Sequence, residues 1–330
     1  MATLATPVRR DDSGSIETMV WVLTRELVAL GHEVTVFATP GSEVAGRLVS
    51  PVPGTYAVDG APSEWFYCEW ANLCAAVTAA GEFDVIHSHA YLWSLPLEPL
   101  SPTPLVHTLH TRVGDGQVAM RRLHPAAVIT GISDYQWSDW PDWPPTAVVR
   151  HGIDVDLPPP QVPVEPYLLW LGRFLPDKGA LEAIEAARLL DLPLRLAGPA
   201  NAWFHEVVRP HVDGDRVRYE GWVTGEHKHR LLAGAAALVY PVSTLEPFGL
   251  VLAEAVVRGT PVAAYAVGAV PELLEDGVTG CAVQDPRDLA LAVAACLHLD
   301  RQVVAGRGRE RFSAARMARE YAGVFAAVAR

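Results

Sequence analysis

Short apolar runs rich in β-branched residues alternate with helix-like stretches along the whole chain. In the first half the expected strands are TLAT, EVTVFA, DVIHSH, PLVHTL and AAVITGIS, and in the second half they are YLLWLG, PLRLAG, VRYEGW, AALVYP and PVAAY. This alternation is typical of βαβ units and parallel sheets. The pattern therefore predicts an α/β protein with a separate sheet in each half.

A proline-rich stretch, IDVDLPPPQVPVEP at residues 153–166, separates the two sets of strands. Its five prolines exclude an interior helix or a central strand and favour a stiff linker, with a domain boundary near residue 155. A chain of 330 residues has the length for two domains of about 150 residues each. Because ligands of open parallel sheets bind beyond the carboxyl ends of the strands, we expect functional residues directly after strands, in a cleft between the two domains.

The stretch TLEPFGLVLAEA, residues 244–255, follows one expected strand and carries two carboxylates, Glu246 and Glu254. Pro247 suits a first helical turn because its missing N–H needs no partner there, so the pattern predicts a helix over residues 248–257. Glu246 then lies in the loop before the helix, and Glu254 lies about two turns into it.

The beginning of this helix has the chemistry of an anion site. Gly249 lets a ligand approach the backbone, and its amide, with those of Leu250 and Val251, carries about half a unit of positive charge. A diphosphate bound there would place one glutamate near a sugar and the other near a ribose. The alternative is an ordinary core helix whose glutamates only complement the dipole or face solvent.

A second loop of similar character, GRFLPDKG at residues 172–179, also follows an expected strand. It carries Arg173 and Lys178, which can hold a diphosphate without a metal because arginine offers a forked pair of donors and lysine a mobile charge. Each could equally be an ordinary surface cation. Lys178 is one of only two lysines in the chain, which favours a functional role.

Two further turns have a glycine where a ligand could approach the backbone. Gly268 precedes a short helical stretch that contains Pro271 and Glu272. Gly14 and Ser15 lie between the first expected strand and a helix that begins near residue 16, an arrangement that could expose amides to a phosphate or a sugar.

Several histidines cluster near expected strand ends or the domain boundary: His87, His89, His107, His110, His124 and His151. Strand alternation places His87 and His89 on one face, with no carboxylate at metal-ligand spacing, which favours core residues over a zinc site. His110 and Thr108 end a strand and are expected to point into the cleft, where a neutral imidazole can donate to a sugar hydroxyl.

Three indoles occur within WSDWPDW, residues 137–143. Aromatic faces stack on sugar rings, so Trp137 is a candidate acceptor contact, although local packing around proline explains the cluster as well.

Composition narrows the class of ligand. The net charge is −12, most of it in the first half, which disfavours nucleic acid and anionic lipid and favours a small, diffusing substrate. No apolar run approaches the length of a membrane helix, and the four cysteines show no CxxC spacing, so we expect a soluble cytoplasmic protein with reduced thiols. No GxGxxG follows the first strand, which disfavours a dinucleotide dehydrogenase.

Together these residues resemble glycosyltransferase family 4, retaining enzymes of the GT-B fold that use nucleotide-diphosphate sugars without a metal. The resemblance covers nearly the whole chain and rests on the E-x7-E run EPFGLVLAE together with GRFLPDKG. The stretches SGSIE, HGID, LAGP, EGWV, GTPVAA and GAVPELLEDGVTG agree with it. Family members commonly have a second glycine where this chain has Ser15 and Ala269, which leaves the identity of the sugar open.

The resemblance implies roles for individual residues: Glu246 on the donor sugar, Glu254 on the ribose, and Arg173 with Lys178 on the leaving diphosphate. The catalytic set that it implies is Glu246, His110, Arg173 and Lys178; the donor-binding set is Gly14, Arg173, Lys178, Glu246, Phe248, Gly249, Leu250, Val251 and Glu254; and the acceptor-binding candidates are Ser15 and Trp137.

The implied architecture is two Rossmann-like domains that face each other across a cleft. Residues 1–153 would bind the acceptor, residues 154–312 would bind the nucleotide sugar, and residues 313–330 would form a helix that returns to the first domain. The implied reaction is transfer of a hexosyl group from UDP-glucose or a similar donor to a hydroxyl of a soluble small molecule or saccharide, with no metal or other cofactor. A nucleotide-sugar epimerase or a sugar phosphorylase of the same fold is the alternative.

Overall fold

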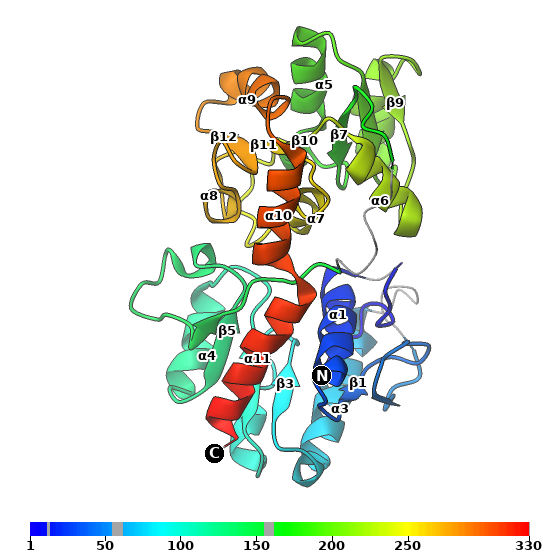
Figure 1. The fold of residues 1–330 in the computed structure, drawn as a ribbon. Helices are drawn as coiled ribbons and strands as arrows, with labels where there is room; N and C mark the ends of the chain where they lie inside the picture. The colour runs from blue at the N-terminus through cyan, green and yellow to red at the C-terminus, as the bar shows by residue number, and fades with distance from the viewer. Residues whose placement is uncertain (12–13, 55–61, 155–161, 330) are drawn as a thin grey trace. The chain divides into compact units, whose positions relative to one another are not determined.

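The computed structural model describes residues 1–11, 14–54, 62–154 and 162–329 (Figure 1). The chain divides into two compact units, Met1–Gly152 with Ala314–Arg330 (unit 1) and Ile153–Ser313 (unit 2). The predicted α/β class is confirmed, because both units are built on parallel strands separated by helices. Of the expected linker, residues 155–161 lie outside the described residues.

Unit 2 contains a six-stranded parallel sheet with the order β12-β11-β10-β7-β8-β9. Its strands are β7 (Leu168–Leu171), β8 (Leu194–Ala197), β9 (Val217–Tyr219), β10 (Ala237–Tyr240), β11 (Val262–Tyr265) and β12 (Gly280–Val283). The chain builds outward from β7 to β9, then crosses to β10 on the other side of β7 and continues to β12. This is the Rossmann order, in which the direction of winding reverses between β7 and β10.

Helices cover both faces of this sheet, with α5 and α9 on one side and α7 beside α10 on the other (Figure 1). The α-helices are α5 (Ala180–Leu189), α6 (Gly225–Gly234), α7 (Leu250–Val256), α8 (Val270–Leu273), α9 (Leu289–Cys296) and α10 (Arg301–Phe312). Shorter helical turns are η4 (Pro176–Lys178), η5 (Phe204–Val208), η6 (Arg209–His211) and η7 (Pro286–Asp288). Strands that are buried on both faces explain the continuous apolar runs LLWL and ALVY.

Unit 1 contains a four-stranded parallel sheet, β3-β4-β5-β6, and a separate pair, β1-β2. The strands are β1 (Thr35–Phe37), β2 (Arg47–Val49), β3 (Ile86–Ser88), β4 (Leu105–Thr108), β5 (Val128–Gly131) and β6 (Ala147–Val148). The helices are α1 (Ser15–Ala29), α3 (Pro62–Thr78), α4 (Asp115–Leu123) and α11 (Ala314–Val328), with short turns η1 (Ala80–Glu82), η2 (Leu95–Leu100) and η3 (Tyr135–Trp137).

The last helix, α11, packs on the earlier part of unit 1. The Tyr321 hydroxyl lies 3.0 Å from the Thr108 hydroxyl at the end of β4. Arg316 donates to the backbone carbonyl of Arg150 at 2.8 Å, so both halves of α11 are joined to unit 1.

The expected first strand, TLAT, is wrong. The amides of Leu4 and Thr6 donate to the carboxylates of Glu69 (2.8 Å) and Glu17 (3.4 Å) instead of to a neighbouring strand. Three strands, β2, β6 and β12, were not predicted, because their sequence patterns are weak. β2 has three residues and β6 has two, and β12 begins with a glycine.

Two further observations concern membrane crossing and cysteines. In the described part of the chain, no single helix has the length and apolar character to cross a bilayer. One pair of helical segments, residues 286–296 and 301–312, reaches that length and apolar character only when the two are counted together, and they are bent by 109° where they meet. All four cysteines are free thiols; Cys296 is buried, whereas Cys74 is exposed.

Candidate functional site

Two loops of unit 2 meet where the winding of the sheet reverses, which is the position at which sheets of this kind bind ligands. One loop follows β7 and the other follows β10, and these strands pair in parallel. Gly179 ends the first loop with a φ of +74°, and a Cβ atom there would lie 2.3 Å from the carbonyl oxygen of Pro241. The Ser243 amide also donates to the Asp177 carbonyl at 2.9 Å, so the two loops form one surface.

Glu246 is held at both carboxylate oxygens. Lys178 Nζ donates to its Oε1, and the Tyr240 hydroxyl donates to its Oε2. The side chains of Lys178 and Glu246 are 12% and 30% exposed, and Asp177 lies 3.7 Å from the same ammonium. Burial, together with the neighbouring Glu246 charge, raises the pKa of Tyr240 well above its usual value, so this hydroxyl stays a donor.

The helix that carries the second glutamate, α7, begins at Leu250 and not at residue 248 as predicted, because Gly249 has a φ of +110° and cannot be helical. In its first turn the Leu252 amide donates to the Gly249 carbonyl at 3.1 Å, whereas the amides of Gly249, Leu250 and Val251 remain possible donors to a ligand. Phe248 is 3% exposed, and its ring packs edge-on against Phe312 at 6.2 Å. A side-chain contact between Phe248 and a donor does not fit this burial.

Glu254 pairs with the second lysine of the chain. Lys228 Nζ, on α6, lies 2.6 Å from Glu254 Oε1. Burial alone would raise the pKa of Glu254, but the charges of Lys228 and Arg258 outweigh it and lower that pKa. Its Oε2 is buried and has no hydrogen-bond partner among the described residues, which leaves an acceptor for a ligand hydroxyl.

Sequence reasoning missed Tyr240 and Lys228. The available signal was the rarity of lysine, since the two lysines of the chain hold the two glutamates of the E-x7-E run. Arg173 is exposed, and in the described parts of the chain its guanidinium has no hydrogen bond or ion pair. The structure therefore joins Lys178 to Glu246 but brings Arg173 into contact with neither.

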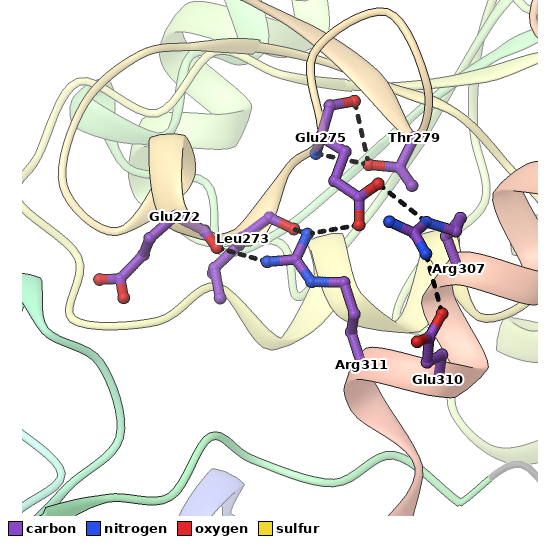
Figure 2. A network of polar contacts seen from close by, with 7 residues as sticks. All are labelled: Glu272, Leu273, Glu275, Thr279, Arg307, Glu310 and Arg311. Carbon is purple, nitrogen blue, oxygen red and sulfur yellow. Dashed lines mark hydrogen bonds and ion pairs between the residues drawn. The ribbon is translucent and has the colours of Figure 1, made fainter.

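A third loop, after β11, supports the backbone of Glu246. Gly268 has a φ of +65°, and a Cβ atom there would lie 2.7 Å from the Glu246 carbonyl oxygen, which also accepts from the Ala269 amide at 3.2 Å. The backbone that Gly268 approaches is therefore that of Glu246, whereas the sequence suggested the approach of a ligand. Figure 2 shows how α10 holds the end of this loop: Arg311 donates to the Glu272 carbonyl at 2.6 Å, and Arg307 pairs with Glu275.

In unit 1, Gly14 is the cap of α1. Its amide donates to the Thr6 hydroxyl at 2.7 Å, and a Cβ atom there would lie 2.3 Å from Glu17 Oε2. The need for glycine is thus explained by Glu17, while Ser15, the first residue of α1, is exposed.

Four histidines of unit 1 form a column of rings. Successive ring centroids are 4.1 Å apart for His87 and His89, 5.2 Å for His89 and His110, and 5.3 Å for His110 and His151. His89 Nδ1 and His110 Nε2 share a hydrogen bond of 2.9 Å. Burial lowers the pKa of His110 to about 3 and those of the other three well below the usual value, so the column is uncharged at neutral pH.

This column agrees only partly with the predictions. His87 and His89 share a face, as strand alternation predicts. Thr108 was expected to point into a cleft, but it is fully buried and bonds to Thr130 and Tyr321, because α11 covers it. His110 is 9% exposed and its Nδ1 has no partner in the part of the chain that is described, so its contact with a sugar stays a prediction.

Trp137 lies in an apolar cluster of unit 1 and is 6% exposed. Its neighbours there include Leu92 and Ile129. A ring buried in this way has little surface for stacking, so the acceptor role expected for Trp137 does not fit the structure.

The Rossmann-ordered sheet, with cations and carboxylates at its switch point, defines an α/β protein of the doubly wound class. Comparison with known proteins gives the family. Residues 16–157 match the model described as glycosyltransferase family 4, and residues 165–299 match the one described as glycosyl transferases group 1. A D-inositol 3-phosphate glycosyltransferase from Frankia alni is 31% identical over 341 residues, which cover 83% of this chain and 84% of that protein. The chain therefore belongs to glycosyltransferase family 4 and is a glycosyltransferase.

Solved structures agree with this assignment. The glycosyltransferase AviGT4, involved in avilamycin A biosynthesis, superposes with a TM-score of 0.70 at 26% identity, covering 96% of this chain and 90% of its own. HepE from Anabaena, solved in complex with UDP, superposes with a TM-score of 0.72 at 17% identity, covering 98% of both chains. The fold is thus GT-B, as the sequence motifs predict.

Proposed function

We propose that the protein transfers a hexosyl group from a UDP-sugar to a hydroxyl of a small polar or saccharide acceptor, with retention of configuration and without a metal. The observation that carries this proposal is the pair of lysine-held glutamates at the switch point of unit 2. The presence of UDP in the HepE complex supports the nucleotide, and the name of the Frankia alni relative supports a polyhydroxylated acceptor of the cyclitol type.

In this proposal the nucleotide diphosphate is held by cations that belong to the protein. Arg173 is exposed, and Lys178 lies at the same loop with one donor already on Glu246. These two cations and the amides at the start of α7 offset the charge that develops on the leaving phosphate. No further Lewis acid is needed for that step, which is why we propose a metal-independent reaction.

The two glutamates hold the two sugars of the donor. The Glu254 oxygen that lacks a partner accepts from a ribose hydroxyl, which relieves the cost of its burial. Glu246, fixed at both oxygens, accepts from hydroxyls of the transferred sugar. The bond from the anomeric carbon to the diphosphate oxygen breaks, the acceptor hydroxyl bonds to that carbon from the same face, and its proton passes to the leaving phosphate.

The test is product analysis with the full chain, UDP-glucose and a panel of cyclitol and saccharide acceptors, in EDTA. We expect a glycosylated acceptor with the anomeric configuration of the donor, read by NMR. An inverted product contradicts retention, and activity that requires added Mg²⁺ or Mn²⁺ contradicts metal independence.

The two alternative reactions give different outcomes in the same assay. An epimerase consumes the nucleotide sugar without any acceptor, and a phosphorylase produces a sugar phosphate only when inorganic phosphate is present. Either result would replace the proposed reaction.

A further inference from the structure

Tyr240 occupies an unusual position for a buried aromatic residue. It is the last residue of β10, a central strand next to the switch point, and it is 7% exposed. Its side chain is buried, and its hydroxyl donates to Glu246 Oε2 in the loop beyond the strand. A phenylalanine would fill the same space without this bond.

Gly249 leaves space beside the Tyr240 hydroxyl. A Cβ atom on Gly249 would lie 3.1 Å from the Tyr240 oxygen, so the missing side chain at this position leaves room for the hydroxyl beside the start of α7. Gly249 is therefore required twice, once for its positive φ and once for this space.

Lys178 and Tyr240 together determine the orientation of Glu246. Each donates to a different oxygen of the carboxylate; Lys178 lies in the loop after β7, and Tyr240 is the last residue of β10. Lys178 has a second task in the proposed function, because a bound diphosphate competes for its ammonium. Tyr240 has no such competing partner among the described residues, since its hydroxyl faces only Glu246.

We propose that Tyr240 is a positioning residue, which keeps the Glu246 carboxylate oriented toward the transferred sugar when Lys178 turns to the diphosphate. This inference rests on the proposed function, because it assigns to Tyr240 a part in the same donor site. It acts through Glu246 and needs no contact between Tyr240 and the substrate.

The test is the kinetics of Tyr240→Phe in the full chain with UDP-glucose as donor. We expect kcat to fall about 10- to 100-fold, the range found when a group that orients a metal ligand is removed, while the KM for the donor and the affinity for UDP change less than about threefold. A merely structural role would instead lower the melting temperature and the UDP affinity together.

Tyr167→Phe is the matched control, because its hydroxyl also donates within unit 2, to the Leu231 carbonyl at 2.8 Å and not to a carboxylate of the proposed donor site. We expect this control to keep wild-type kcat. If Tyr240→Phe also keeps wild-type kcat, or if both variants lose kcat equally, Tyr240 does not position Glu246.

A double-mutant cycle separates this inference from the proposed function. If Tyr240 acts only through Glu246, the variant Tyr240→Phe/Glu246→Gln transfers no more slowly than Glu246→Gln alone. Additive losses contradict the inference and leave the proposed function intact. Wild-type transfer by Glu246→Gln contradicts the proposed role of Glu246 itself, whatever Tyr240 does.

Discussion

Unit 2 and unit 1 each contain a group of buried titratable side chains, but the group in unit 2 is charged and the group in unit 1 is uncharged. In unit 2, Glu254 keeps its charge because Lys228 and Arg258 lower its pKa. In unit 1, the four histidines of the column are uncharged, because burial lowers their pKa and no carboxylate lies among them in the described residues. A group of charges held by counter-ions can exchange partners with an ionic ligand, whereas uncharged imidazole rings can only pack or form neutral hydrogen bonds.

The largest expected effect tests the charged group. Lys178→Ala removes a cation from the leaving phosphate and one donor from Glu246, so we expect kcat to fall roughly 10² to 10³-fold, the cost of removing one preorganised donor from a developing anion. Steady-state kinetics with UDP-glucose measures it. Arg230→Ala is the control, because among the described residues that side chain pairs only with Glu226 on an exposed face, and it should stay within twofold.

Lys228→Met tests the second pair of the same group. It leaves Glu254 buried without its nearest counter-ion, so we expect affinity for UDP to fall about 10- to 100-fold, because a lost hydrogen bond to a charged group costs about 1.5 to 3 kcal/mol. Calorimetric titration with UDP measures the change. Unchanged affinity would show that Glu254 does not bind the nucleotide.

The pH dependence of stability tests the uncharged group. Folded His110 has a pKa of about 3, below its unfolded value, so the unfolded chain binds more protons between about pH 6.5 and pH 3. The contribution of His110 to the free energy of unfolding is therefore fully present above about pH 6.5, and it is lost at about 1.4 kcal/mol per pH unit between about pH 6.5 and pH 3. Urea unfolding of wild type and His110→Asn measures this slope.

The variant should show a shallower decrease between pH 7 and pH 5 than the wild type. His227→Asn, which alters an exposed histidine of unit 2, should keep the wild-type slope. Equal slopes for all three proteins would contradict a histidine column that folds uncharged.

The smallest effect concerns the support of Glu246. Gly268→Ala forces a Cβ atom against the Glu246 carbonyl, whereas Gly277→Ala carries the same left-handed strain, at φ +69°, in open space. The left-handed φ should cost each variant about 1 to 2 kcal/mol of stability, and Gly268→Ala should lose more because its Cβ also clashes with the backbone of Glu246. Only Gly268→Ala should lower kcat, severalfold, as measured in the transfer assay. Equal kcat values would show that this loop does not fix Glu246.

The strands and the two functional loops could be predicted because they depend on local pattern. Apolar runs that end at Gly-containing loops located β7 and β10, and the E-x7-E spacing located both glutamates. The start of α7 was missed by two residues, because a positive φ at Gly249 cannot be read from an apolar helix pattern.

The contacts that complete each group could not be predicted, because they join distant segments. Lys228 and Glu254 are 26 residues apart on two helices, and Tyr240 looked like any apolar residue of a strand. Thr108 ends a strand in the expected way, but Tyr321, 213 residues later, covers it. Local pattern correctly predicted that His87 and His89 share a face, but it could not show what packs upon it.

The central claim, that the lysine-held glutamates of unit 2 bind a nucleotide diphosphate, is tested most directly by calorimetric titration of UDP into the full chain in EDTA. The account predicts saturable binding that weakens at least tenfold in Glu254→Gln and in Arg173→Ala. Binding of equal strength in the wild type and both variants would contradict it.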